Sequence, residues 1–265
     1  MYNFDYTRPS SLDEALKALS SGDEVKLMAG GQTLIPTLKQ RLAQPSKVID
    51  LSGIAELKGI KLEGDSIVIG AMTPHAAVAD SADVKAKIPA LASLAHGIGD
   101  PQVRNRGTLG GSISNNDPAA DYPAALMALG ATVHTNKRQL AAEDFFDGMF
   151  TTALEEDEIV TKVSFPIPEK AAYAKFAQPA SRYALVGVFV AKTGGGARVA
   201  VTGAGEGGVF RVNEFEAALS KNFAAAALDG ISVPADGLNG DIHGSPEYRA
   251  HLIGVMAKRA VQAAG

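Results

Sequence analysis

The sequence is constrained most by a run of polar and glycine residues that passes directly into a helix-like segment. The run reads VRNRGTLGGSISNNDPAADYPAAL and covers residues 103–126. A second glycine-rich stretch, AGGQT, occupies residues 29–33 after an apolar segment. Glycine tolerates positive φ and carries no side chain, so a ligand can reach successive backbone N–H groups that together attract an anion. Two such stretches facing one another could hold a pyrophosphate.

Either stretch alone is more simply a tight turn that serves only the fold, because short glycine patterns match by chance. If the two converge, Thr33, Thr108 and Ser112 would add neutral hydroxyl donors. Their spacing along the chain does not establish convergence. The pair therefore suggests a diphosphate-containing ligand and leaves a purely structural role open for each stretch.

The composition of the 265-residue chain is that of an ordinary folded protein, with 46% hydrophobic and 20% charged residues. A net charge of −4 without a Lys/Arg-rich run disfavours nucleic-acid binding. The N-terminus lacks the basic start and apolar segment of a signal peptide, and no apolar run approaches the roughly 18–20 residues of a membrane helix. We expect a soluble cytoplasmic protein.

The chain has no cysteine, which excludes disulfides, thiolate metal sites, cysteine nucleophiles and cysteine-ligated iron–sulfur clusters on this chain. Its five histidines are scattered without close pairs, so we expect no metal site. Spacing supports no Ser/His/Asp or paired-carboxylate arrangement, so no catalytic residue is assigned.

Hydrophobic periodicity predicts a mixture of helices and strands, with a separate α+β domain where the pattern restarts near residues 166–172. The start is β-α-β-like, with a helix near 10–22 that Ser10 or Ser11 could cap. A hairpin turns at Gly64-Asp65, a second turn lies at Asn136-Lys137, and residues 172–205 suggest three antiparallel strands. The other predicted segments are strands near 24–31, 46–54 and 157–168, and helices near 33–42, 74–80, 88–95, 122–130, 214–219, 222–228 and 247–264.

A third glycine pattern matches a dinucleotide-binding fingerprint. Gly203, Gly205 and Gly208 follow an apparent strand, and Asp229 lies about 20 residues on, where a ribose-binding acid is expected. A helix should begin within the fingerprint, yet strand-like residues follow it. A glycine-rich hairpin end is the simpler interpretation, and a Rossmann-type NAD(P) enzyme stays the alternative.

Several single residues allow two interpretations each. Asp121 and Asp117 precede helix-like residues and could simply cap them, or Asp121 could bind a ligand hydroxyl. Arg104 and Arg106 could offset phosphate charge or pair with surface acids. Tyr183 lies in a polar turn between strands, where packing is more common than stacking on a ligand.

Taken together, these residues resemble the FAD-binding medium subunit of molybdenum hydroxylases, the family of aerobic carbon monoxide dehydrogenase and xanthine dehydrogenase. The resemblance covers about residues 1–205. It rests on the run at 103–126 and, in order along the chain, on AGGQTLIPTLKQRLAQPSKVIDLSGI, IGAMT, DFF, DEIVTKVSFP and KFAQPASRYALVGV.

The resemblance implies an α+β fold. A two-subdomain FAD-binding domain of the vanillyl-alcohol-oxidase type would span residues 1–55 and 56–165, with FAD between the subdomains. A smaller α+β domain with a three-stranded antiparallel sheet would follow at 166–265. Gln32 and Ser112 stand where some relatives carry other hydrogen-bonding residues, which weakens a specific assignment to carbon monoxide oxidation.

The resemblance also implies which residues bind FAD non-covalently. The two glycine-rich stretches would cradle the pyrophosphate, Asn115 and Asp121 would bind the diphosphate or ribityl region, and backbone at 159–160 would contact the adenine side. Lys175 and Tyr183 would lie near the isoalloxazine. The implied set is Ala29, Gly30, Gly31, Gln32, Thr33, Leu34, Thr108, Gly110, Gly111, Ser112, Asn115, Asp121, Ile159, Val160, Lys175 and Tyr183.

The partners follow from the same resemblance. A large subunit would hold the molybdenum cofactor and oxidise the substrate. A small subunit would pass electrons through two [2Fe–2S] clusters to FAD on this chain, and the flavin would deliver them to a quinone, NAD or oxygen. A dimer of heterotrimers with an apolar docking surface is expected. The remaining alternative is a non-catalytic assembly subunit.

Overall fold

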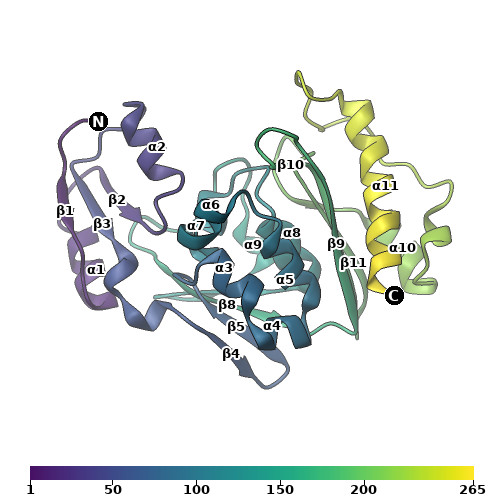
Figure 1. The fold of residues 1–265 in the computed structure, drawn as a ribbon, viewed down its shortest axis with the longest axis horizontal. Coiled ribbons are helices and arrows are strands. Elements are labelled where there is room, and N and C mark those ends of the chain that lie inside the picture. Colours follow the sequence, from purple (N-terminus) through teal and green to yellow (C-terminus); the bar gives the residue numbers. More distant parts are fainter.

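The computed structural model describes residues 1–265 as three β-sheets that follow one another along the chain (Figure 1). The N-terminal sheet lies at one end of the molecule, and the long C-terminal helix lies at the other. The central sheet and most of the short helices lie between these ends. None of the helices combines the length and the apolar character that a bilayer crossing requires.

The N-terminal sheet is parallel and contains the predicted β-α-β unit. In chain order its elements are β1 (Asp5–Thr7), α1 (Leu12–Leu19), β2 (Val25–Met28), α2 (Leu34–Lys39), β3 (Lys47–Asp50), η1 (Leu51–Gly53) and η2 (Ala55–Leu57). The strand order is β1-β3-β2, so β3 is the central strand. The three-residue strand β1 was not predicted, because so short a segment carries no periodicity.

Helix α1 begins at its predicted cap. The Glu14 N–H donates to Ser11 Oγ at 3.3 Å, and the Glu14 carboxylate accepts from the Ser10 N–H at 2.8 Å. These bonds satisfy donors that a helix start leaves free. Ala15 on the inner face is fully buried with Ile49 in the core of the N-terminal part.

The central sheet is antiparallel throughout and includes both predicted turns. Its strands are β4 (Ile60–Glu63), β5 (Ser66–Gly70), β6 (Thr132–Thr135), β7 (Gln139–Ala141) and β8 (Val160–Pro166), in the order β4-β5-β8-β6-β7. Its helices are α3 (His75–Asp80), α4 (Ala82–Lys87), α5 (Pro89–His96), α6 (Pro101–Arg106), α7 (Leu109–Asn115), α8 (Tyr122–Leu129) and α9 (Ala142–Phe145). Helices α4, α6, α7 and α9 were not predicted.

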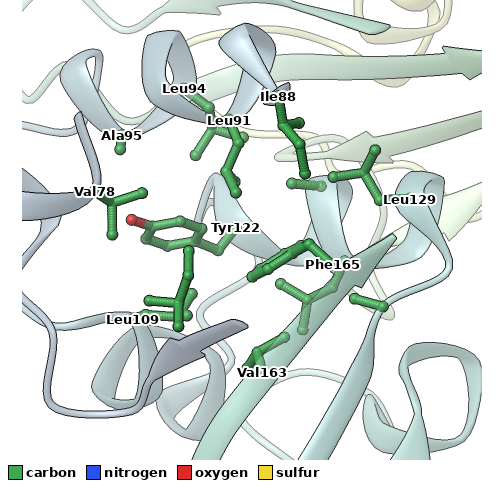
Figure 2. Packing of buried hydrophobic residues seen from close by; sticks show 14 of the residues in the cluster. Val78, Ile88, Leu91, Leu94, Ala95, Leu109, Tyr122, Leu129, Val163 and Phe165 are labelled. Atoms are coloured by element: carbon green, nitrogen blue, oxygen red, sulfur yellow. The ribbon is translucent and has the colours of Figure 1, made fainter. Parts of the chain in front are cut away.

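The largest core lies between this sheet and its helices. The ring of Tyr122 lies among Val78, Leu91 and Leu109, with Phe165 of β8 beside it (Figure 2). Each of these five side chains is fully enclosed. Tyr122 is the first residue of α8, so this packing fixes the start of α8 directly after the polar residues of the run at 103–126.

The C-terminal sheet is antiparallel and is covered by the longest helix. Its elements are β9 (Lys170–Ala177), β10 (Ala184–Thr193), β11 (Gly196–Thr202), β12 (Phe210–Arg211), α10 (Asn213–Lys221), η3 (Ala225–Leu228) and α11 (Pro246–Ala264). The strand order is β12-β11-β10-β9. Strand β12 extends the predicted three strands by a short fourth, through two residues that pair with Ala200 and Val201.

Strand β10 is buried on both faces, which explains its continuous apolar run. Val186, Val188 and Val190 belong to the core beneath α11, whereas Phe189 and Ala191 belong to the central core. Alternate side chains of a strand point to opposite faces, so the sheet lies between α11 on one side and α5 and α8 on the other. This contact brings β9 next to the start of α8.

One predicted α-helix is absent. Of the predicted residues 222–228, only Ala225–Leu228 are helical, as the 3₁₀ turn η3, because the chain is extended at Asn222, with φ of −149° and ψ of 105°. The alanines that follow form only this short 3₁₀ turn and no α-helix.

Candidate functional site

The two glycine-rich stretches meet in space. A Cβ on Gly30 would collide with the carbonyl oxygen of Arg106 and lie 2.7 Å from Gly107 Cα. A Cβ on Gly111 would lie 3.1 Å from Ala29 Cβ. Neither position has room for a larger side chain, so glycine at 30 and 111 lets the stretches touch. The convergence that the sequence left open is confirmed.

The first stretch connects β2 to α2 and offers free backbone donors. Gly31 has a φ of +73°, in the left-handed region. No backbone N–H from Gly30 to Leu34 donates to another group of the chain, and the side chains of Gln32 and Thr33 are exposed. Successive free N–H groups beside a left-handed residue form a concavity that attracts an anion.

The second stretch is not the open turn that the sequence suggested. The Gly110 N–H donates to Ala71 O at 2.8 Å, and the Gly111 N–H donates at 3.1 Å to Oγ1 of Thr108, which caps α7. A Cβ on Gly110 would lie 2.6 Å from that of Ala71, so this glycine permits close packing. The glycine N–H groups are used inside the chain, because the stretch begins a helix. Only the first stretch has the free N–H groups of a nest.

Helix α7 adds two polar side chains beside the junction. Ser112 and Asn115 lie three residues apart and thus neighbour each other on the helix surface, and Gly111, which contacts Ala29, lies next to both. Both side chains are half-buried, and neither makes a hydrogen bond within the chain. Their polar atoms are available to a ligand alongside the nest.

The residue after Asn115 has a different role. Asn116 is left-handed, with φ of 43°, and is 2% exposed. Its Nδ2 donates to Gly148 O at 2.7 Å and to Thr151 O at 2.8 Å, which ties down the loop between α9 and β8. Asp117 then accepts from the Ala119 N–H at 2.9 Å in a local turn. The interpretation of Asp117 as a helix cap is wrong, because no helix begins there.

Asp121 does not cap α8 with its side chain either. Its carboxylate accepts from the hydroxyl of Tyr173 at 2.5 Å and lies 3.0 Å from Nζ of Lys175. Both partners belong to β9, two residues apart and hence on one face of the strand. Burial raises the pKa of Asp121, while the Lys175 ammonium and the Tyr173 hydroxyl oppose that rise. The carboxylate therefore joins two elements, which corrects the cap interpretation.

Lys175 also donates to Gly97 O at 2.8 Å, at the end of α5. Tyr183, by contrast, is 52% exposed in the turn between β9 and β10, and its hydroxyl makes no hydrogen bond within the chain. Partial burial raises its pKa, and the carboxylates of Asp117 and Asp121 raise it further, so the phenol stays protonated. Of these two side chains, only Tyr183 presents a free polar group.

Ile159 and Val160 lie where the chain enters β8, a strand that contacts α7. The Ile159 N–H donates to Oδ1 of Asn136 at 2.7 Å, and its carbonyl accepts from the Asn136 N–H at 3.1 Å. The side chain of Ile159 is buried with Met72 in the N-terminal core. Both backbone groups of Ile159 thus already have partners.

Sequence reasoning missed His75, which lies directly behind the second stretch. The backbone N–H of His75 donates to Gly107 O at 3.0 Å, and the centroid of its ring lies 5.4 Å from the ring centroid of Tyr122. Burial lowers the pKa of His75 to about 4. Neither His75 Nδ1 nor the Tyr122 hydroxyl has a partner. A lone histidine followed by alanines carries no signal that would have singled it out.

The two arginines of the run at 103–126 have different surroundings. Arg104 Nη1 donates to Ile98 O and Gly99 O, each at 3.1 Å, and so braces the loop before α6. Arg106 is exposed and makes no side-chain bond within the chain. Only Arg106 stays free to face a ligand or a partner.

The structure contradicts the Rossmann alternative. The fingerprint glycines follow β11, which pairs antiparallel with both of its neighbours. A dinucleotide fold needs a parallel strand and a helix that starts within the glycines. Here Gly203 and Gly208 are left-handed turn residues, and the next helix begins only at Asn213. No three His, Cys, Asp or Glu side chains gather as a group that could hold a metal ion.

Comparison with known proteins gives a consistent result. The family described as the FAD binding domain in molybdopterin dehydrogenase matches residues 2–168. The carbon monoxide dehydrogenase medium chain of Hydrogenophaga pseudoflava is 37% identical, over 98% of this chain and 96% of the relative. The nicotine 6-hydroxylase medium subunit of Paenarthrobacter nicotinovorans is 35% identical, with the same coverage of 98% and 96%.

The fold agrees with the same group. A solved structure of carbon monoxide dehydrogenase from Hydrogenophaga pseudoflava, lacking the Mo-pyranopterin moiety of the molybdenum cofactor, superimposes with a TM-score of 0.89 at 37% identity. The match covers 99% of this chain and 97% of the other, so it includes the C-terminal sheet and α11, beyond the matched family domain.

Proposed function

This chain belongs to the family of FAD-binding domains in molybdopterin dehydrogenases, and we propose that it is the flavin-bearing electron-transfer subunit of a larger complex. It is an FAD-binding medium subunit of the molybdenum hydroxylase type, an oxidoreductase subunit. In our proposal, electrons arrive from [2Fe–2S] clusters on a small subunit and leave to an external acceptor. A large molybdenum-binding subunit oxidises the substrate, in a cytoplasmic dimer of heterotrimers.

The residues at the junction fit FAD. A diphosphate needs several donors and a close backbone approach. The free N–H groups from Gly30 to Leu34 supply the donors, and the close contacts that Gly30 and Gly111 permit bring the second stretch against this backbone. The convergence of the two stretches at this nest is the single observation that carries the proposal.

We propose a division of roles among the implied residues. The backbone of 29–34 binds the pyrophosphate without a covalent bond, and Thr108, Gly110 and Gly111 shape the wall opposite. Ser112 and Asn115 bind the diphosphate or ribityl region with their free side chains. The adenine side lies toward 159–160, where both backbone groups of Ile159 have partners and Val160 pairs with Thr135 of β6.

At the flavin end the proposed roles differ between residues. Tyr183 contacts the isoalloxazine directly with its exposed ring. The charges of Asp121 and Lys175 are already paired with each other. This pair holds β9 against α8 beside the isoalloxazine ring. Bound FAD supplies a carrier for one or two electrons, and this chain's residues bind, orient and shield it without acting as acid or base.

The proposed division into subdomains follows the sheets. Residues 1–55 and 56–165 would hold FAD between them, and 166–265 would close the flavin end. The FAD content of the purified complex tests the proposal. We expect about one FAD per copy of this chain. Acid should release this cofactor, which should absorb light at about 450 nm. A complex that assembles with its partners yet contains no FAD would favour the assembly-subunit alternative instead.

A further inference from the structure

The connection between α7 and α8, residues 116–121, contains no helix or strand. It follows Asn115, the last residue of α7, and it ends at Asp121, so the proposed FAD site includes residues at both of its ends. Such a connection cannot satisfy its backbone carbonyl groups through a regular ladder of hydrogen bonds, so other elements must supply donors. The element that supplies them determines where Asp121 lies.

Strand β11 of the C-terminal sheet supplies these donors. The hydroxyl of Thr202, the last residue of β11, shares its proton between Ala120 O at 2.6 Å and Pro118 O at 3.0 Å. The N–H of Gly203 also donates to Pro118 O, at 2.8 Å. Thr202 is fully buried, so water cannot readily take the place of its hydroxyl. The backbone directly before Asp121 is therefore held from β11.

Thr202 belongs to a row of three residues that crosses the sheet. Gly187 of β10 pairs with Thr202 on one side and with Lys175 of β9 on the other. Residues that pair directly across antiparallel strands point to the same face of the sheet. On this face, Thr202 binds the backbone before Asp121, and Lys175 lies 3.0 Å from the carboxylate of Asp121. The row therefore holds the start of α8 from two strands, one on each side of Gly187.

The middle of this row is a notch, because Gly187 has no side chain. A Cβ on Gly187 would collide with the hydroxyl of Tyr173 and lie 2.9 Å from Cγ2 of Thr202. Glycine weakens the interior of a strand and often marks a close approach of another group. Here it leaves room for the Tyr173 hydroxyl, which donates to Asp121 at 2.5 Å. The apolar run of β10 is thus interrupted where the strand faces the residue that begins α8.

The same face of β11 also holds the other end of α8. Arg198 lies four residues before Thr202, and alternate residues of a strand share a face. The guanidinium of Arg198 donates twice to Met127 O, at 2.8 Å and 3.0 Å. Met127 lies in the last turn of α8, at the end remote from Asp121. Two residues of β11 thus anchor opposite ends of one helix, and only Thr202 holds the end that belongs to the proposed FAD site.

We propose that Thr202 is a positioning residue for FAD. Its side chain is fully enclosed, so it does not touch the cofactor and acts only through the connection that ends at Asp121. The proposal rests on the function proposed above and gives the C-terminal sheet a part in cofactor binding. Both Thr202 and Gly187 lie outside the matched FAD-binding domain, which ends at residue 168.

Substitutions in the intact complex test this role. Thr202→Val removes the hydroxyl and keeps the shape of the side chain, whereas Thr202→Ser keeps the hydroxyl. Arg198→Met is the matched control, because it releases the other end of α8. For each variant, flavin fluorescence after dilution measures the rate of FAD release, and thermal unfolding measures Tm. Hydrogen exchange of peptides that cover 116–122 reports how firmly the connection is held, with or without cofactor.

We expect Thr202→Val to release FAD about tenfold faster, a change of about 1.4 kcal/mol in the barrier, and to exchange faster at 116–122. Thr202→Ser should behave like the wild type. Arg198→Met should lower Tm and release FAD at the wild-type rate.

Three results would overturn the proposal. Thr202→Val could lower Tm without faster FAD release, or Arg198→Met could release FAD as fast as Thr202→Val; either would show that β11 only stabilises the fold. Thr202→Ser could release FAD as fast as Thr202→Val, which would assign the effect to packing. A wild-type complex without FAD would instead refute the proposed function. Equal exchange at 116–122 in Thr202→Val and the wild type would overturn the present proposal whether or not FAD is bound.

Discussion

Nζ of Lys175 lies 3.0 Å from Oδ1 of Asp121, and both side chains are nearly enclosed, with exposed fractions of 11% and 6%. The same ammonium donates to Gly97 O, and the same carboxylate accepts from Tyr173. The pair thus pins the end of α5, the start of α8 and strand β9 together. These three elements meet where the central part of the chain contacts the C-terminal sheet, beside the proposed flavin end.

Lys175→Met should destabilise the protein strongly near neutral pH. It leaves the Asp121 carboxylate buried without its cation, which costs about 3–5 kcal/mol for such pairs. Burial already raises the pKa of Asp121, and loss of the ammonium raises it further. A carboxyl with a raised pKa loses stability as pH rises through that pKa, so the deficit of the variant should shrink at lower pH. Chemical denaturation at pH 7 and pH 5 measures the difference.

The matched control is Lys170→Met, at an exposed lysine on the same strand. It should change the free energy of unfolding by less than about 1 kcal/mol, as surface charges usually do. A Lys175→Met deficit that is the same at both pH values would show that lost packing, and not the uncompensated carboxylate, accounts for the effect.

Gly110→Ala should mainly reduce stability, whereas Gly111→Ala should mainly reduce FAD binding. A Cβ at 110 would lie 2.6 Å from that of Ala71, so we expect a loss of stability of about 1–3 kcal/mol from overpacking. A Cβ at 111 would lie 2.9 Å from Oγ1 of Thr108, which caps α7, and 3.1 Å from that of Ala29, so it would push the two stretches apart. We expect this variant to lose most of its FAD with a smaller change in Tm. FAD content and thermal unfolding, measured together, separate the two outcomes.

Gly207→Ala supplies the control, because a Cβ there would meet nothing within 4 Å and the residue lies in the loop after β11. It should retain both FAD and stability. If Gly111→Ala keeps full FAD content, the contact between the stretches does not shape the pyrophosphate site.

Asn115 and Asn116 are neighbours for which we predict opposite phenotypes. Asn115→Ala removes a side chain with no partner in the chain, so it should weaken FAD binding by about tenfold, the value of one to two hydrogen bonds, and leave stability unchanged. Asn116→Ala removes two buried bonds to Gly148 and Thr151 and a favoured left-handed residue, so it should cost about 2–3 kcal/mol. Titration of the apoprotein with FAD and denaturation of the holoprotein measure the two effects. A pair of equal phenotypes would contradict this assignment.

Local sequence patterns predicted much of this fold. The Ser11 cap, the turn at Gly64-Asp65 and the apolar run of β10 each carry their own signal, and each lies where expected. The four-residue helix α9 and the two-residue strand β12 span too little chain for any periodicity to appear. Their positions depend on tertiary contacts, which single-sequence patterns do not encode.

The site divides in the same way. Glycine at 30 and 111 could be recognised from the sequence as a place of close approach, but only the structure shows that each glycine approaches the other stretch. Asp121 was interpreted as a cap because caps are local, whereas its true partners, Tyr173 and Lys175, lie more than fifty residues away. The sequence shows that alternate residues of β9 lie on one face of the strand. It does not show which element that face contacts.

The buried imidazole behind the second stretch should make the protein sensitive to acid. The pKa of His75 is lowered to about 4 by burial, against an ordinary value of 6.5. The unfolded chain therefore binds this proton more readily than the native state does, and stability falls as pH drops below 6.5. A difference of about 2.5 pKa units corresponds to about 3 kcal/mol, lost in full below about pH 4. His75→Leu should remove this part of the pH dependence, and His96→Leu, at an exposed histidine, should not. Denaturation midpoints between pH 7 and pH 4 measure the slopes, and a slope that His75→Leu leaves unchanged would show that the imidazole is protonated in the native state without cost.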